Sequence, residues 1–238
     1  MSESSESNDA TVPTAANPVP STRLNGSLPI TTPAEAAASV PETATLLVSG
    51  FGGVGYPKLV PEAIAAGDQH ELTVVSGGGV GDEIDRDLVE SGDMARRYPF
   101  VPNETVRDAV NAGEVAFHDR HISRLADEVR FGGLRAGING PTVAIVEAVA
   151  IGADWLIPST SVGHTPAYVE TADHLIVEVN RAQPLELGRV HDVYLRQAPP
   201  HREPIPLDDP PDTIGGPAIG FDPATLRAVV ETHPHDDP

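Results

Sequence analysis

One stretch of the chain, Thr45–Ala66, places a strand, a glycine turn and the start of a helix in immediate succession. Thr45–Val48 is an apolar run rich in β-branched residues, and apolar residues recur at helical spacing from Pro57 onward. Between them lie four glycines in six residues, Gly50, Gly52, Gly53 and Gly55. Glycine allows backbone conformations that other residues avoid, and the free N–H groups at a helix start attract anions. The stretch therefore predicts an α/β unit with an anion-binding turn.

The same alternation of short apolar runs and helical patterns continues along the chain. Thr142–Ile151 is almost entirely apolar, as expected for a strand that is covered on both faces. Asp82 and Asn103 are suitable caps for two helices, and a third helical pattern ends at Gly132. Further strands are predicted at residues 46–49, 72–76, 155–157 and 174–180. Together these patterns predict an α/β fold with an open, mainly parallel sheet flanked by helices.

Composition divides the chain into three parts. Residues 1–20 are polar and acidic and should form a disordered tail, whereas residues 21–198 carry the α/β pattern. Residues 199–238 are expected to form a proline-rich arm and a C-terminal helix that begins at Asp222, with Leu226 and Val229 on its apolar face. The acidic N-terminus does not resemble a signal peptide and no apolar run reaches membrane-spanning length, so we expect a cytoplasmic protein.

The charge balance is strongly acidic. Asp and Glu number 35 against 15 Lys and Arg, the net charge is -20, and Lys58 is the only lysine. This balance favours a surface adapted to salt, as in proteins of halophiles, over that of an ordinary acidic cytosolic protein. It disfavours nucleic-acid binding, which needs clustered Lys and Arg. Because the chain has no cysteine, disulfides, thiolate metal sites and a cysteine nucleophile are excluded.

The glycine turn has three possible roles. Gly50, Gly52 and Gly55 fit the dinucleotide pattern G-x-G-x-x-G after a strand. However, the next strand runs into Ser76 and three glycines, where a dinucleotide site would place an acidic residue. We therefore favour a role in binding an oxyanion or acyl group over nicotinamide binding, and a purely structural tight turn remains open.

Two further segments carry candidate polar residues. Asp119, His121 and Ser123 resemble metal ligands or a nucleophile and its base, but no second cluster completes such a site. We expect no metal, with Asp119 capping the next helix and His121 lining a cleft. The residues Ser161, Gly163 and His164 follow a short strand, where an open α/β sheet holds its ligand. The alternative is that this loop only caps the following helix.

Two glutamates interrupt apolar strands. Glu147 lies inside TVAIVEAVAI and Glu178 inside HLIVEVN. Burial penalises a charged carboxylate, so each must be paired, hydrogen-bonded or shifted toward its neutral form. Either could be a catalytic acid, but a glutamate at a strand end that pairs with an arginine is the more common arrangement.

Several blocks together resemble the N-terminal half of the acetyl-CoA hydrolase/transferase family, which includes succinyl-CoA:acetate and propionyl-CoA:succinate CoA-transferases. These blocks are GFGGVGYPKLVPEAI, HDRHISRLADEVRFG, TVAIVEAVAI, IPSTSVGHTPAYVETADHLIVEVN and REPIP through IGGPAIGFDPATLRAVVET. The resemblance runs from about Ala34 to Thr232. It implies a CoA-transferase-type α/β domain, one of two in a full-length member.

The resemblance also implies a chemistry. A glutamate attacks the acyl-CoA thioester and passes through a glutamyl-CoA intermediate, but in full-length members that glutamate and most CoA contacts lie in the C-terminal half. The first-half blocks would form the near wall of the acyl cleft, with CoA as a substrate and no tightly bound cofactor. The residues expected there are Gly50, Gly52, Gly53, Gly55, Tyr56, Asp119, His121, Ser123, Ser161, Gly163 and His164.

Three hypotheses follow from the sequence. The favoured one is a split CoA-transferase subunit, part of an oligomer, whose partner supplies the catalytic glutamate. The second is a truncated, inactive remnant or binding subunit. The third is a stand-alone nucleotide-dependent oxidoreductase that uses the turn from Gly50 to Gly55.

Overall fold

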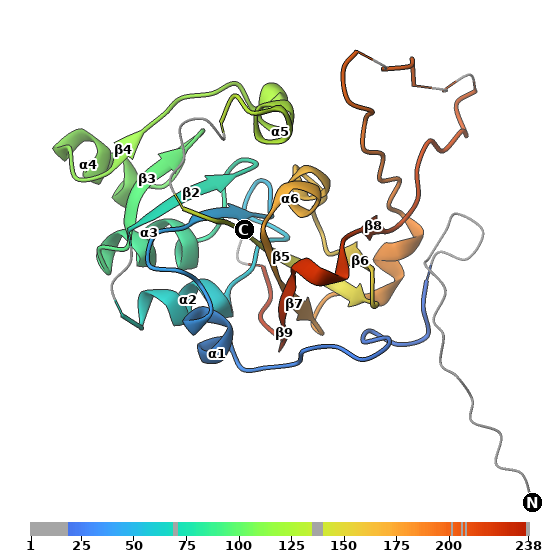
Figure 1. Cartoon of the computed structure of the whole chain (residues 1–238), viewed down its shortest axis with the longest axis horizontal. Helices are drawn as coiled ribbons and strands as arrows, with labels where there is room; N and C mark the ends of the chain where they lie inside the picture. Colours follow the sequence, from blue (N-terminus) through green and yellow to red (C-terminus); the bar gives the residue numbers. More distant parts are fainter. Residues whose placement is uncertain are drawn as a thin grey trace, which may run out of the picture.

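The described part of the chain forms a mixed sheet of nine strands, with helices on both of its faces (Figure 1). The computed structural model describes residues 19–68, 71–134, 140–200, 202–205, 207 and 209–236. The predicted α/β fold is therefore confirmed. The tail predicted for residues 1–20 lies outside the described residues except for its last two positions.

Most of the strand pairs are parallel. One arm of the sheet runs in the order β4 (Ala116–Phe117), β3 (Met94–Tyr98), β2 (Leu72–Ser76), β1 (Thr45–Val48) and β5 (Thr142–Ile151). Beyond β5, the strands β7 (His174–Asn180) and β9 (Leu226–Thr232) continue in parallel. The far half of β5 pairs antiparallel with β6 (Trp155–Pro158), which pairs with β8 (Ile219–Gly220). All ten residues of β5 are buried, as its apolar sequence predicts.

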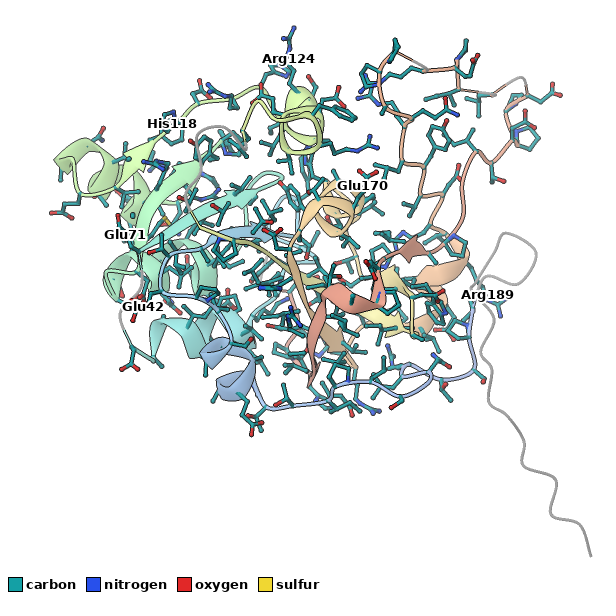
Figure 2. All side chains as sticks on the ribbon, viewed as in Figure 1. Glu42, Glu71, His118, Arg124, Glu170 and Arg189 are labelled. Carbon is teal, nitrogen blue, oxygen red and sulfur yellow. The ribbon has the colours of Figure 1, made fainter. Side chains whose placement is uncertain are left out.

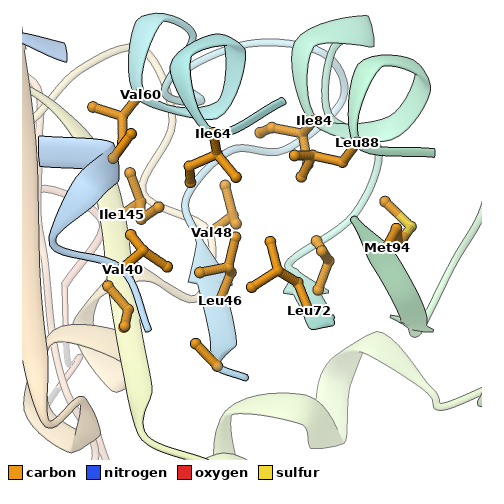
Figure 3. Close-up of a cluster of buried hydrophobic side chains, with 14 of the residues drawn as sticks. Val40, Leu46, Val48, Val60, Ile64, Leu72, Ile84, Leu88, Met94 and Ile145 are labelled. Atoms are coloured by element: carbon orange, nitrogen blue, oxygen red, sulfur yellow. The ribbon is translucent and has the colours of Figure 1, made fainter. Parts of the chain in front are cut away.

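Four helices cover one face of the sheet. They are α1 (Pro33–Ala38), α2 (Leu59–Ala65), α3 (Asp82–Glu90) and α4 (Glu104–Ala112). Side chains fill the space between the layers, whereas labelled charged residues such as Glu42 and Arg124 are exposed at the outer surface (Figure 2). Leu46, Val48, Ile64 and Ile84 meet in the core on this face (Figure 3).

The opposite face is covered by α5 (Ile122–Phe131) and α6 (Thr165–Thr171). Leu47, which alternates with Leu46 and Val48, packs on this side with Leu125 and Tyr168. The structure also describes two short 3₁₀ helices among the residues that it places, η2 (Leu185–Arg189) and η3 (Pro223–Thr225). Among the described residues, none of the helices combines the length and the apolar character that crossing a bilayer requires.

The prediction of a helix that begins at Asp222 is wrong. Only the single turn η3 follows Asp222, and residues 226–232 form strand β9, which pairs with β7. The apolar residues of this segment occupy both faces of the sheet, because Val230 packs with the α1–α4 core and Val229 with the α5–α6 core. A strand buried on both faces is nearly all apolar, so its spacing also fits a helical stripe. The chain after the proline-rich arm thus belongs to the same sheet.

The predicted caps are partly confirmed. The side chain of Asn103 accepts hydrogen bonds from the N–H groups of Thr105 and Val106 and caps α4, which ends at Gly113 with a φ of 80°. Asp82 is the first residue of α3 rather than its cap, and Gly81 occupies the N-cap position.

Candidate functional site

The glycine turn joins the carboxyl end of β1 to α2. Its glycines all have positive φ: 118° at Gly50, 64° at Gly52, 80° at Gly53 and 66° at Gly55. A side chain on Gly55 would place its Cβ 2.6 Å from the backbone nitrogen of Ser161, whereas one on Gly52 or Gly53 would meet open space. Close packing therefore requires a glycine at position 55, whereas the tip of the turn at Gly52 and Gly53 faces open space.

The tip of the turn forms one wall of a cleft of about 720 Å³. The second glycine loop, after β2, and the start of α3 form the opposite wall. The lining residues are Phe51, Gly52, Gly53, Tyr56, Glu62, Gly78, Gly79, Val80, Gly81, Asp82, Glu83, Arg86, Asp87, Phe100, Pro102 and Ile122. The cleft lies at the carboxyl ends of parallel strands, where open α/β sheets bind their ligands.

The loop that holds Ser161, Gly163 and His164 packs behind this wall rather than lining the cleft. A Cβ on Gly77 would lie 2.7 Å from Nδ1 of His164, and one on Gly163 would lie 3.4 Å from the carbonyl oxygen of Gly50. His164 Nε2 lies 2.9 Å from the carbonyl oxygen of Ile122, and burial lowers the pKa of His164, which favours the neutral ring. These residues support the glycine backbone from the rear.

The segment from Asp119 to Ser123 differs from its prediction in two respects: Asp119 does not cap α5, and His121 does not line the main cleft. His121, not Asp119, is the N-cap of α5, and its Nδ1 accepts a hydrogen bond from the backbone N–H of Ser123. An imidazole nitrogen can cap a helix much as a carboxylate does, so the sequence alone could not assign the cap. Asp119 lies in a separate groove beside Phe100 and Phe117. Of this segment, Ile122 is the residue that reaches the main cleft. A role in substrate binding for Asp119, His121 and Ser123 stays a prediction.

A buried polar network lies beneath the turn. The Nζ of Lys58 is 2.9 Å from Oε2 of Glu147 and 2.9 Å from Oδ1 of Asp236, and the Lys58 side chain is 1% exposed. Burial lowers the pKa of Lys58, but the two carboxylates outweigh it, so the net shift is upward. Glu147 also accepts hydrogen bonds from Ser159 and Asn180. Glu147 thus pairs with a lysine, where the sequence pattern favoured an arginine.

Asp236 connects the end of the described chain to the turn. Its carboxylate accepts hydrogen bonds from the Gly55 N–H, at 3.2 Å, and from Thr160 Oγ1, at 2.9 Å. Gln183 Nε2 donates a third, at 3.1 Å. The signal for these contacts is absent from the local sequence, because Asp236 is separated from Gly55 by 181 positions.

Glu178 occupies the helix start that the sequence marks as an anion site. Its carboxylate accepts hydrogen bonds from the backbone N–H groups of Lys58, at 2.9 Å, Leu59, at 3.3 Å, and Val60, at 2.7 Å. Burial raises the pKa of Glu178 to about 7, while these N–H donors act in the opposite direction. The group that the N–H groups at the start of α2 bind is therefore the chain's own Glu178 carboxyl.

Neither strand glutamate is available for attack on a substrate. Both side chains are 0% exposed and fully engaged in hydrogen bonds. Within the described ranges, no group of three His, Asp or Glu side chains is arranged to hold a metal ion.

A comparison with protein families agrees with this geometry. Residues 28–231 match the acetyl-CoA hydrolase/transferase N-terminal domain. The chain belongs to this family. The predicted family is thereby confirmed.

Characterised relatives show how much of a family member is present. Succinyl-CoA:acetate CoA-transferase of Clostridium kluyveri is 36% identical over 85% of this chain and 38% of that enzyme. Acetyl-CoA hydrolase of Schizosaccharomyces pombe is 34% identical over 77% of this chain and 37% of that enzyme. The chain thus spans a little over a third of the length of these relatives and corresponds to their N-terminal portion.

Solved structures share the fold. RipA from Yersinia pestis aligns with a TM-score of 0.57 at 16% identity, over 88% of this chain and 43% of that protein. The acyl-CoA transferase YdiF from Escherichia coli O157:H7 aligns with a TM-score of 0.53 at 14% identity, over 92% of this chain and 49% of that protein. The confirmed fold class is therefore that of a CoA-transferase domain.

Proposed function

We propose that this chain is the N-terminal half or subunit of an acyl-CoA:carboxylate CoA-transferase or acetyl-CoA hydrolase that acts on short acyl groups such as acetyl, propionyl and succinyl. The proposal rests on one observation: the cleft is open, but neither strand glutamate is accessible for attack on a substrate in it. The cleft has glycine backbone on two walls, but Glu147 and Glu178 are both buried beneath it. The attacking carboxylate then has to come from a C-terminal half.

The reaction that we propose proceeds through that external glutamate. Its carboxylate attacks the thioester carbonyl, and the CoA thiolate leaves to give a mixed anhydride. The thiolate then attacks the glutamyl carbonyl and releases the first acyl group as a carboxylate. A second carboxylate reverses these steps to yield a new acyl-CoA, whereas water releases CoA and completes hydrolysis. Dividing the transfer in this way replaces one high barrier with lower ones.

In this proposal the described chain supplies the near wall of the cleft. At the tip of the turn a side chain on Gly52 would meet open space, and the Gly52 N–H is suited to an oxyanion that develops during the reaction, whereas the Gly53 N–H donates a hydrogen bond to the carbonyl oxygen of Gly79. CoA is a substrate and no cofactor is held tightly. The working enzyme is a cytoplasmic oligomer that contains the C-terminal half.

Reconstitution tests the proposal. The purified chain should transfer no CoA from acetyl-CoA to a radiolabelled carboxylate, and addition of a C-terminal half from a relative should restore transfer. Turnover by the chain alone would contradict the need for a partner. Tight association without turnover would instead favour the second hypothesis, a binding subunit or inactive remnant.

NADH binding by the isolated chain would support the third hypothesis, the nucleotide-dependent oxidoreductase. The cleft charge argues against it, because Glu62, Asp82, Glu83 and Asp87 surround the place where a pyrophosphate would lie.

A further inference from the structure

The cleft has an unusual charge for an enzyme that handles anions, and this charge bears on the acyl group that the proposed CoA-transferase accepts. Four carboxylates line it: Glu62 from α2, and Asp82, Glu83 and Asp87 from α3. Arg86 is the only basic residue among the described lining residues. An additional anionic group bound here would therefore meet a negative potential.

Arg86 does not offset this potential for a ligand. Its guanidinium pairs with Asp82 on the preceding turn of α3 and lies 3.0 Å from Oδ1 of Asp87. Both partners belong to the same wall of the cleft. The positive charge is thus already matched by two carboxylates, and Glu62 and Glu83 remain in excess.

The carboxylates are also close enough to affect one another. Burial raises the pKa of Glu62, and the negative charges of Glu83 and Asp87 raise it further. Tyr56 stays neutral and offsets none of this charge, since burial and the neighbouring Glu83 raise the pKa of its phenol. A ligand with a second negative charge would add to a repulsion that exists already.

The remaining lining is apolar. Phe51 and Phe100 are about half exposed, at 51% and 52%, and lie on this cleft together with Val80, Pro102 and Ile122. A short alkyl chain gains from covering such side chains, in proportion to the apolar area removed from water. The surface therefore suits the methyl or ethyl end of an acyl group.

We propose that this wall makes the enzyme favour the uncharged short acyl groups, acetyl and propionyl, over succinyl, the one acyl group of the proposed range that carries a second carboxylate. The reacting carboxylate or thioester sits at the glycine backbone, and the distal end of the acyl group points toward the acidic and aromatic side chains. The same charge pattern requires the phosphates of CoA to be bound by the C-terminal half. This inference rests on the proposed CoA-transferase function.

The test uses the reconstituted enzyme with a deliberately unfavourable partner. The C-terminal half is taken from the Clostridium kluyveri succinyl-CoA:acetate CoA-transferase, whose name records succinyl-CoA as a substrate. Any discrimination against succinyl-CoA then originates in this chain. We expect kcat/KM for acetyl-CoA and propionyl-CoA to exceed that for succinyl-CoA by about tenfold or more, because repulsion between like charges a few ångström apart at a partly exposed protein site is worth at least a factor of this size.

Variants test whether the carboxylates of α3 in the cleft wall cause this discrimination. The double variant Glu83→Gln with Asp87→Asn should reduce the preference for acetyl-CoA over succinyl-CoA by raising kcat/KM for succinyl-CoA. The matched control, Glu42→Gln with Glu71→Gln, removes the same charge from exposed residues that precede β1 and β2, at the opposite ends of these strands (Figure 2). It should leave the preference unchanged. If the double variant does not fold, the exposed Glu62→Gln variant replaces it and should act in the same direction.

The outcomes separate the two proposals. Equal use of succinyl-CoA and acetyl-CoA by the reconstituted enzyme, or an equal effect of the wall and control variants, overturns the selectivity and leaves the transferase function in place. No transfer with any of the three donors overturns the transferase function and the selectivity with it.

Discussion

At the scale of single residues, the most consequential side chain is Lys58. It is the only lysine in the chain, and it is buried between Glu147 and Asp236. Removing one partner of a buried ion pair leaves the other charge uncompensated in a medium that solvates it poorly. The cation therefore matters to stability more than any surface ion pair.

We predict that Lys58→Met lowers the free energy of unfolding by about 3–5 kcal/mol. The matched control is Arg120→Met, which removes a cation from a solvent-accessible pair with Glu128 and should cost about 1 kcal/mol or less. Denaturant unfolding at one high salt concentration measures both. Similar small losses for the two variants would show that the buried network does not stabilise the fold.

Glu178 gives a prediction about pH. Its pKa in the folded chain is about 7, above the ordinary 4.5, because burial disfavours the charged form. The folded state then binds a proton more tightly than the unfolded chain, so the contribution of Glu178 to stability is complete below pH 4.5 and is lost as pH rises toward 7.

Comparison with Glu178→Gln isolates this effect. The wild-type chain loses stability between pH 5 and pH 8 as Glu178 ionises, and the variant does not. The stability of the variant relative to wild type should therefore improve over this range by on the order of 1–3 kcal/mol. Thermal unfolding at both pH values checks this, and Glu71→Gln, at an exposed position, is the control. A constant difference between Glu178→Gln and wild type would contradict the assignment.

At the scale of elements, local patterns predicted most of the sheet and its helices. Strands β1, β2, β5 and β7 are apolar runs, and α4 carries its cap and its terminal glycine in the sequence. Strand β3 was missed because Arg96 and Arg97 interrupt its apolar character. Arg97 is nevertheless 0% exposed, since Asp85 on α3 pairs with it at 2.9 Å. A partner from another element is invisible to a local pattern.

The candidate site follows the same rule. The positions of the glycine turn and of the Ser161 loop were predictable, because each follows a strand whose sequence is evident, but the Ser161 loop packs behind the cleft rather than lining it. The acidic wall on α3 and the contacts of Asp236 depend on long-range packing, so neither was predicted. The spacing of Leu226, Val229 and Val230 fits both a helix and a buried strand, and pairing with β7 selects the strand.

Strand β9 can be tested directly. Because residues 226–232 pair with β7 and are mostly buried, their amide hydrogens should exchange slowly and together with those of residues 175–180. The amides of Arg202, Glu203 and Ile205 in the arm, which lie outside helices and strands, serve as the internal control and should exchange within seconds to minutes. Hydrogen exchange read by mass spectrometry measures both. Exchange of residues 226–232 as rapid as that of the arm would contradict the assignment of β9 to the sheet.

At the scale of the whole molecule, the excess of negative charge dominates. The net charge is -20, and two of the cations, Lys58 and Arg97, are buried against their own carboxylate partners. Because these two cations are matched by buried carboxylates, the excess of negative charge lies at the surface. Repulsion between exposed charges acts over the Debye length, which falls from about 10 Å at 0.1 M salt to about 3 Å at 1 M.

We predict that the midpoint of thermal unfolding rises by on the order of 5–10 °C between 0.1 M and 2 M KCl, because screening removes repulsion that the unfolded chain relieves by expanding. Sucrose at matched osmolality separates screening from solvent exclusion and should produce a smaller rise. The effect should be largest below 1 M, where the Debye length changes most. A midpoint that is independent of KCl, or that responds equally to sucrose, would show that the acidic surface is not an adaptation to salt.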